Sequence, residues 1–201
     1  MRPEVSICMV THDSAADLAP GLAALAELDY RPLELVLVDC ASRDGSAEIA
    51  RRLQPPGLDG RVIGLDENIG FAGGMNRAIQ EARGEWILSL NPDTRPRPDF
   101  VDRLIELATS TDLPVGAVTG RLVRPEPQGA QSLVDACGMY LTATWRHLDR
   151  GSGQPDRGQW TSAERVFGGT GAATLFRRSA LDDAALDGQV FDPEFHSFRE
   201  D

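Results

Sequence analysis

Polar side chains gather where the apolar segments in the first half of the chain end. Four such segments lead directly into short polar stretches. The carboxyl ends of parallel strands meet at one edge of an open sheet, where α/β proteins bind ligands. One polar strand end would be an ordinary turn, but four together predict a ligand site at that edge. The stretches are Thr11–Asp13, Asp39–Ser46, Asp66–Gly70 and Asn91–Asp93.

The predicted edge is rich in aspartate, which determines the kind of ligand it accepts. Carboxylates repel a bare diphosphate, but they bind Mg²⁺ or Mn²⁺, which then coordinates phosphate oxygens. The cation also neutralises charge on a departing diphosphate. Asp93 follows directly after a buried segment and is the best ligand, although Asn91–Thr94 is also typical of a simple turn. The aspartates are Asp13, Asp39, Asp44, Asp66 and Asp93.

The segment Asn68–Asn76 contains three glycines where a strand should lead into a helix. Glycine lets a ligand approach the backbone closely, and the N-terminus of a helix attracts phosphate. The segment lacks the GxGxxG pattern and follows the third expected strand, so it does not indicate a dinucleotide site. The alternative is a helix start that packs tightly on the sheet.

Two adjacent acids, Glu200 and Asp201, end the chain. A carboxylate can act as a general base, and a like-charged neighbour can raise its pKa towards neutrality. The alternative is an ordinary solvated terminus.

Composition excludes several functions. The formal net charge is −11, so the surface should repel nucleic acids, which bind mainly to clustered cations. All 20 basic residues are arginine. The absence of lysine excludes a P-loop and a Schiff-base enzyme.

The three cysteines, Cys8, Cys40 and Cys137, have no CxxC spacing and predict reduced thiols, not disulfides or a zinc site. No apolar run approaches the roughly 20 residues that cross a bilayer, and no signal peptide is evident. We therefore expect a cytoplasmic protein, with peripheral association at the inner face of the membrane left open. The oligomeric state is not indicated.

The first half alternates apolar segments with helical patterns, which predicts an α/β fold with a mostly parallel central sheet flanked by helices. Pro20 places the start of the first helix near Ser14–Asp17, and Asp44 is a candidate N-cap. The expected strands are Val5–Val10, Leu33–Val38, Arg61–Leu65 and Trp86–Leu90. The other expected helices are Gly45–Leu53, Phe71–Ala82 and Pro98–Ala108.

The second half is less regular. Val115–Val123, Met139–Trp145 and Ala172–Arg177 are expected strands, separated by polar loops. The length suits one domain, 1–201, with a nucleotide-sugar-binding half (1–110) and an acceptor-side half (111–201).

As a set, these segments resemble family 2 glycosyltransferases with the GT-A fold, a Rossmann-like three-layer sandwich. The rhamnosyltransferase-like branch is the most similar. The segments that carry the resemblance are Val5–Thr11, Val38–Ser46, Asn68–Asn76, Leu90–Thr94, Gly168–Arg178 and Phe191–Asp201.

The resemblance implies roles for individual residues. Asp93, in an Asp-x-Asp-like motif with asparagine first, would bind the metal ion, and Asp201 beside Glu200 would be the catalytic base. Gly169, Thr170 and Gly171 would line the acceptor side of the donor sugar. The residues implied in binding the nucleotide are Thr11, Asp13, Asp39, Ser42, Asp44, Asn68, Gly70, Gly73, Gly74, Asn76 and Asn91, with Asp39 on the base edge.

The implied reaction is an in-line displacement with inversion at the anomeric carbon of a nucleoside-diphosphate sugar. The family branch suggests rhamnose, and a dTDP- or UDP-linked donor. The acceptor would be a glycan or a lipid-linked precursor. General-base assistance contributes ~10²–10⁴-fold to such a rate.

The sequence departs from the family at several points. Cys40 replaces a common asparagine, and His12-Asp13 replaces an aromatic-Asn pair. Family members usually continue beyond the position of Asp201 into a helix carrying an arginine. We therefore expect this chain to lack elements that hold its catalytic base, Asp201. Such a chain would bind the donor but transfer its sugar slowly.

Three other functions are alternatives for a chain of this pattern. A truncated module could bind a nucleotide sugar without transferring it, and donor turnover with Mn²⁺ would distinguish this case. A nucleotidyltransferase would need a basic glycine-rich loop with lysine after the first strand. An NAD-dependent oxidoreductase would need its glycine fingerprint. The sequence contains neither feature.

Overall fold

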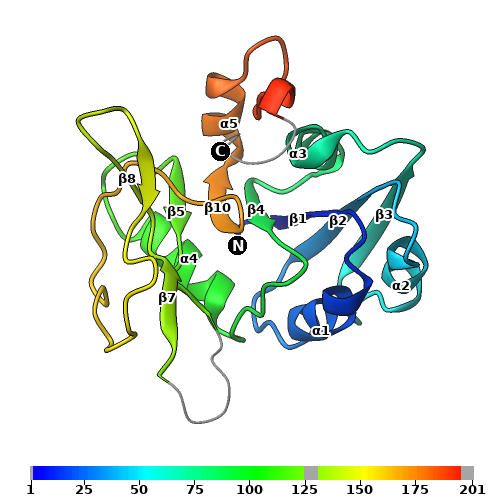
Figure 1. Ribbon diagram of the computed structural model, residues 1–201, viewed down its shortest axis with the longest axis horizontal. Coiled ribbons are helices and arrows are strands. Elements are labelled where there is room, and N and C mark those ends of the chain that lie inside the picture. The colour runs from blue at the N-terminus through cyan, green and yellow to red at the C-terminus, as the bar shows by residue number, and fades with distance from the viewer. Residues whose placement is uncertain (1, 125–130, 196–201) are drawn as a thin grey trace.

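A six-stranded sheet forms the centre of the computed structural model, which describes residues 2–124 and 131–195. The strand order is β3-β2-β1-β4-β10-β5 (Figure 1). The first four of these strands run parallel, whereas β10 is antiparallel to both β4 and β5. The strands are β1 (Val5–Thr11), β2 (Leu33–Cys40), β3 (Asp59–Leu65), β4 (Trp86–Leu90), β5 (Ala117–Thr119) and β10 (Ala173–Arg177).

Helices cover both faces of this sheet, which confirms the predicted α/β class. α1, α2 and α4 pack on one face, and α3 and α5 on the other (Figure 1). Alternate residues of β1 serve the two cores, since Ile7 and Met9 contact one and Cys8 and Val10 the other. The helices are α1 (Ala15–Ala26), α2 (Ser46–Arg52), α3 (Gly70–Glu81), α4 (Phe100–Thr109) and α5 (Arg178–Ala184), with a short 3₁₀ helix η1 (Pro193–Phe195).

The strand order reverses beside β1. The chain adds β2 and then β3 on one side of β1, and α3 then carries it back to place β4 on the other side. In open α/β sheets, the crevice at such a reversal is the usual ligand site. The carboxyl ends of β1 and β4 are therefore the place to look for function.

The regular first half agrees with the sequence-based boundaries to within one or two residues. α1 begins at Ala15 as predicted, but Pro20 lies in the second turn and not in the first. Pro20 cannot donate to the carbonyl of Ala16. Both residues are exposed, so water can satisfy that carbonyl.

The second half corrects two predicted strands. Val115–Val123 is not one strand, because the chain breaks at Gly120, where a Cβ would lie 2.5 Å from the Phe100 ring. Met139–Trp145 is a strand only as far as Leu141. Helix α5 and the short strands at residues 133–136 and 147–149 were not predicted from the sequence. Beyond the main sheet lie two antiparallel pairs, β6 (Leu122–Arg124) with β7 (Leu133–Ala136), and β8 (Met139–Leu141) with β9 (His147–Asp149).

Among the described residues, no helix is both long enough and apolar enough to span a bilayer.

A buried polar cluster ties the strands together near the start of β4. Glu34 is only 2% exposed and accepts hydrogen bonds from the Ser6 hydroxyl (2.5 Å) and the backbone N–H of Arg83 (2.5 Å). The Ser6 hydroxyl also accepts from the N–H of Gly84 (2.7 Å). Arg83 reaches outwards to Asp59, and this ion pair lowers the pKa of the Asp59 carboxyl. The cluster joins β1, β2 and the loop before β4.

We predict that Glu34→Ala lowers the free energy of unfolding by about 3 kcal/mol, because buried donors on Ser6 and Arg83 lose their acceptor. Urea unfolding monitored by circular dichroism measures the change. Asp59→Ala, which removes the exposed partner of Arg83, should change stability much less. Equal effects of the two substitutions would contradict this account.

Candidate active site

A cleft of about 280 Å³ opens at the reversal of strand order. Its walls come from the end of β1, the first turn of α1, the start of α3 and the turn after β4. The lining residues are Val10, Asp13, Ser14, Asp17, Phe71, Asn91, Pro92 and Asp93. Two of the four predicted strand ends thus meet in one cavity, together with the helix that follows the third.

Three carboxylates, those of Asp13, Asp17 and Asp93, line this cleft. No group of three or more His, Cys, Asp or Glu side chains close enough to hold a metal ion occurs among the described residues. Single carboxylates such as these suit Mg²⁺ or Mn²⁺, because Mg²⁺ commonly uses one or two protein carboxylates and takes its remaining ligands from phosphate and water. Asp93 is exposed at the turn and suits this shared coordination.

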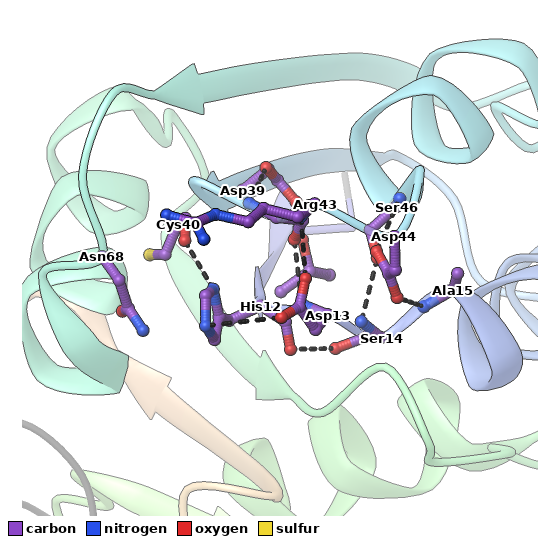
Figure 2. A network of polar contacts seen from close by, with 12 residues as sticks. His12, Asp13, Ser14, Ala15, Asp39, Cys40, Arg43, Asp44, Ser46 and Asn68 are labelled. Atoms are coloured by element: carbon purple, nitrogen blue, oxygen red, sulfur yellow. Dashed lines mark hydrogen bonds and ion pairs between the residues drawn. The ribbon is translucent and has the colours of Figure 1, made fainter.

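Asp39, at the end of β2, has a carboxylate in a fixed orientation. Its Oδ1 accepts hydrogen bonds from the hydroxyls of Thr11 (2.9 Å) and Ser42 (2.6 Å), and its Oδ2 accepts from the N–H of Ser42 (3.1 Å). The residue is 3% exposed. Figure 2 shows Asp39 beside the loop that follows β1. A carboxylate held in this way can accept a hydrogen bond from a ligand N–H without first reorganising.

The loops after β1 and β2 are joined by Asp13 and His12 (Figure 2). Asp13 Oδ1 accepts from the N–H of Arg43 (2.7 Å), and the N–H of Asp13 donates to the Ser42 hydroxyl (3.0 Å). His12 Nδ1 lies 2.7 Å from the carbonyl oxygen of Cys40. Since that oxygen only accepts, Nδ1 carries the hydrogen. These contacts place Asp13, with φ +48°, at the wall of the cleft.

Asp44 stabilises the starts of two helices. Its Oδ1 accepts from the hydroxyl (2.6 Å) and N–H (3.0 Å) of Ser46, and its Oδ2 accepts from the N–H of Ala15 (2.8 Å). The hydrogen bond from the Ser46 hydroxyl, followed by that from Ala15, lowers the pKa of the Asp44 carboxyl. The predicted N-cap is corrected by one residue, because Gly45, with φ +91°, occupies that position. The predicted contact of Asp44 with the nucleotide stays a prediction.

The glycine-rich segment packs on the sheet. The N–H of Gly70 donates to Asn68 Oδ1 (2.9 Å) where α3 begins. A Cβ at Gly74 would lie 2.7 Å from Val10 Cγ1 and 3.0 Å from Cys40 Sγ, and one at Gly73 would lie 3.0 Å from the Ile69 side chain. Gly74 therefore allows α3 to approach β1 and β2 closely. Of this segment, Phe71 lines the cleft.

Asn76 has a structural role that its sequence position does not reveal. Its Oδ1 accepts from the N–H groups of Val190 and Phe191 (both 3.0 Å), and its Nδ2 donates to the Phe191 carbonyl (2.7 Å). The residue is 4% exposed. These bonds attach residues 190–191 to α3 and occupy the side-chain oxygen and one of the two amide N–H groups.

The predicted acceptor-side segment lies next to the turn that carries Asp93. The carbonyl of Gly171 accepts a hydrogen bond from the Ser89 hydroxyl. The next carbonyl, of Ala172, accepts from the N–H of Asn91 (3.1 Å). Thr170 accepts from the Thr174 hydroxyl through its carbonyl (2.7 Å). A Cβ at Gly169 would lie 2.3 Å from Thr174 Oγ1, so only glycine fits there.

Glu200 and Asp201, the predicted catalytic pair, lie outside the described residues.

Burial keeps two thiols near the site unreactive. Burial raises the pKa of Cys40 to about 11 and raises that of Cys8 further. Both are therefore neutral thiols at physiological pH and unsuited to act as nucleophiles.

Five residues that line the cleft were not predicted as site residues from the sequence: Val10, Ser14, Asp17, Phe71 and Pro92. Asp17 could have been predicted as a site residue from the sequence, because it lies in the first turn of a helix that follows a polar strand end. The others line the cleft only because α1, α3 and the turn after β4 meet there.

The sequence profile of "Glycosyl transferase family 2" matches residues 6–184, which is most of the chain. The chain belongs to glycosyl transferase family 2. This confirms the family predicted from the sequence motifs.

Two characterised relatives illustrate the range of this similarity. The succinoglycan biosynthesis protein ExoO of Rhizobium meliloti is 30% identical over 129 residues, covering 61% of this chain and 36% of that protein. The N-acetylglucosaminyl-diphospho-decaprenol L-rhamnosyltransferase of Mycobacterium tuberculosis is 28% identical over 224 residues, covering 100% of this chain and 69% of that protein. The chain thus spans only part of the length of each relative.

Solved structures agree on the GT-A fold. TarS of S. aureus in complex with UDP superposes with a TM-score of 0.64 over 98% of this chain and 52% of its own, at 19% identity. The mannosyltransferase PcManGT from Pyrobaculum calidifontis, in complex with GDP-Man and Mn²⁺, has a TM-score of 0.55 and 31% identity over 59% of this chain and 35% of its own.

We predict that Asn76→Ala lowers the free energy of unfolding by about 3 kcal/mol, because it leaves buried backbone groups of residues 190–191 without partners. Chemical denaturation measures the loss, and Gln80→Ala on the exposed side of α3 is the control. A variant of unchanged stability with weakened nucleotide binding would instead assign Asn76 to the donor site.

Proposed function

We propose that this chain is the catalytic domain of an inverting, metal-dependent glycosyltransferase, which transfers a sugar from a nucleoside diphosphate to an acceptor hydroxyl. The observation that carries the proposal is the cleft at the strand-order reversal. It brings Asp93 into one cavity with Asp13, whose loop is bonded to that of Asp39. Family membership gives the reaction class.

The nucleoside end of the donor would bind at the ends of β1 and β2. The fixed carboxylate of Asp39 suits an N–H on the base edge of uracil or thymine, and Thr11 orients that carboxylate. Asp13 and Ser42 hold the adjoining loops together. In this proposal, residues 1–110 bind the donor, and residues 111–201 form the acceptor side.

The diphosphate end needs a cation because the cleft is acidic. Asp93 would bind Mg²⁺ or Mn²⁺ together with diphosphate oxygens, and Asn91 would border the same turn. The cation would stabilise the charge that develops on the departing nucleoside diphosphate. Without it, the carboxylates of Asp13, Asp17 and Asp93 would repel the donor.

The acceptor would approach over residues 169–171, which are bonded to β4 next to the turn. By family resemblance, Asp201 would remove the proton from the acceptor hydroxyl as the glycosidic bond to the diphosphate breaks, with Glu200 beside it. Attack from the opposite face of the sugar inverts the anomeric carbon.

For the donor we propose a dTDP- or UDP-linked sugar, and rhamnose is the first sugar to test. The support is the rhamnosyltransferase relative, whose alignment spans this whole chain. That relative's name also suggests a lipid-linked acceptor.

A thermal-shift screen tests the donor proposal. We expect dTDP or UDP with Mn²⁺ to raise the melting temperature more than GDP does, because ligand binding to the native state stabilises it by mass action. Chelation with EDTA should remove most of this shift. No stabilisation by any of the three nucleotides would overturn the proposed function.

A substitution at Asp93 tests the role of the cation. Asp93→Asn should weaken nucleotide binding in Mn²⁺ by at least roughly tenfold. Metal-free binding should stay unchanged or become tighter, because the turn keeps its shape and loses a carboxylate that repels the diphosphate. Isothermal titration calorimetry measures both affinities. Asp112→Asn, exposed on the loop after α4, is the matched control. Loss of affinity in the absence of metal would argue against a metal ligand.

A further inference from the structure

The turn that carries Asp93 is held from two sides. On the β10 side, the N–H of Asn91 donates to the Ala172 carbonyl (3.1 Å), and the N–H of Thr94 closes the turn onto the Asn91 carbonyl (3.1 Å). On the other side lies α1. The β10 contacts are ordinary strand-end hydrogen bonds, whereas the α1 contacts depend on particular residue types.

Gly21, in the middle of α1, lies directly against this turn. A Cβ at this position would lie 2.4 Å from the carbonyl oxygen of Pro92 and 3.4 Å from its carbonyl carbon. Cβ atoms in proteins do not approach another atom that closely, and a backbone carbonyl cannot rotate away as a side chain can. Any larger residue at position 21 must therefore push the turn away from α1, and Asp93 would move with it.

Arg95 links the same two elements. Its Nη1 donates to the carbonyls of Pro92 (3.2 Å) and Thr94 (3.3 Å), and its Nη2 lies 3.5 Å from the carboxylate of Asp17 in the first turn of α1. The side chain is 38% exposed, so the ion pair itself contributes little to stability. Its importance lies in the geometry, because one planar group spans the turn and the helix.

The start of α1 is fixed in turn to the loop after β2. The N–H of Ala15 donates to Asp44, and the N–H of Ser14 donates to the Ser46 hydroxyl (2.9 Å). α1 thus lies between the loop after β2 and the turn that carries Asp93, and it contacts both.

We propose that Gly21 and Arg95 are positioning residues that set the place of Asp93 relative to the nucleoside loop. They thereby determine how tightly the cleft holds a nucleoside diphosphate together with its divalent cation. The inference rests on the proposed function in giving Asp93 the cation. Supporting residues of this kind typically change metal affinity or activity by 10- to 100-fold when they are replaced.

The experiment compares Gly21→Ala and Arg95→Met with the original chain and with Gly64→Ala. Gly64 is an exposed glycine on β3 whose added Cβ would meet only the flexible end of the Arg51 side chain. The first readout is amide hydrogen exchange of residues 91–95 in the protein without ligand. The second is calorimetric binding of dTDP and UDP, with and without Mn²⁺.

Both variants should exchange faster across residues 91–95 and lose roughly 10- to 100-fold of their affinity for nucleotide in Mn²⁺. Their affinity without metal should stay close to the original value, as should the melting temperature of Arg95→Met and every property of Gly64→Ala. Gly21→Ala should also melt at a lower temperature, because its Cβ overlaps a backbone carbonyl. If Gly21→Ala does not fold, Arg95→Met decides the question. A folded variant with unchanged exchange and unchanged Mn²⁺-dependent affinity would overturn the inference.

Failure of the proposed function has a different signature. In that case the original chain binds neither nucleotide more tightly with Mn²⁺ than without it. The inferred role of Gly21 and Arg95 in cation binding would then be wrong as well. Hydrogen exchange of residues 91–95 would still show whether these two residues hold the turn in place.

Discussion

The parallel pairing of β1 with β4 determines where every other part of the site lies. It aligns Val5 with Trp86 and continues to Cys8 and Ser89, so the two strands end at the same edge. Because β2 and β3 lie on the other side of β1, the strand order reverses at this pair, and such a reversal leaves a crevice at the carboxyl ends of the strands. The first turn of α1 forms one wall of the cleft, and the turn after β4 forms another.

Electrostatics limits what this cleft can bind. Its walls carry carboxylates, and the whole chain has a formal net charge of −11. For the nucleoside diphosphate that we propose as ligand, these charges would be repulsive unless a cation lies between the diphosphate and the carboxylates. In the proposed complex, the donor would supply most of the oxygen ligands of the cation, as is usual for Mg²⁺ bound with substrate phosphates.

Close backbone approach recurs in this fold, and at three glycines it brings parts of the chain into contact. Gly74 brings α3 onto β1 and β2, Gly21 brings the turn after β4 onto α1, and Gly169 lies against Thr174. Glycine has the same sequence signature in each case, because it leaves space where a Cβ would clash. What fills that space is decided by elements far away in the chain.

The α/β class, the family, the strands β1 to β4 and the aspartates at their ends could be predicted from the sequence, because buried apolar runs and polar strand ends are local patterns. The predictions that were wrong or missing concern features that depend on contacts between elements distant in the chain. A predicted strand is interrupted at Gly120, which lies against the Phe100 ring, and Asn76 is hydrogen-bonded to residues 190–191, more than a hundred positions away. Only the tertiary structure showed that Asp17, Phe71 and Pro92 share a cleft with Asp93. The physical reason is that a sequence pattern specifies which side of an element is buried, whereas helix packing specifies what lies against it.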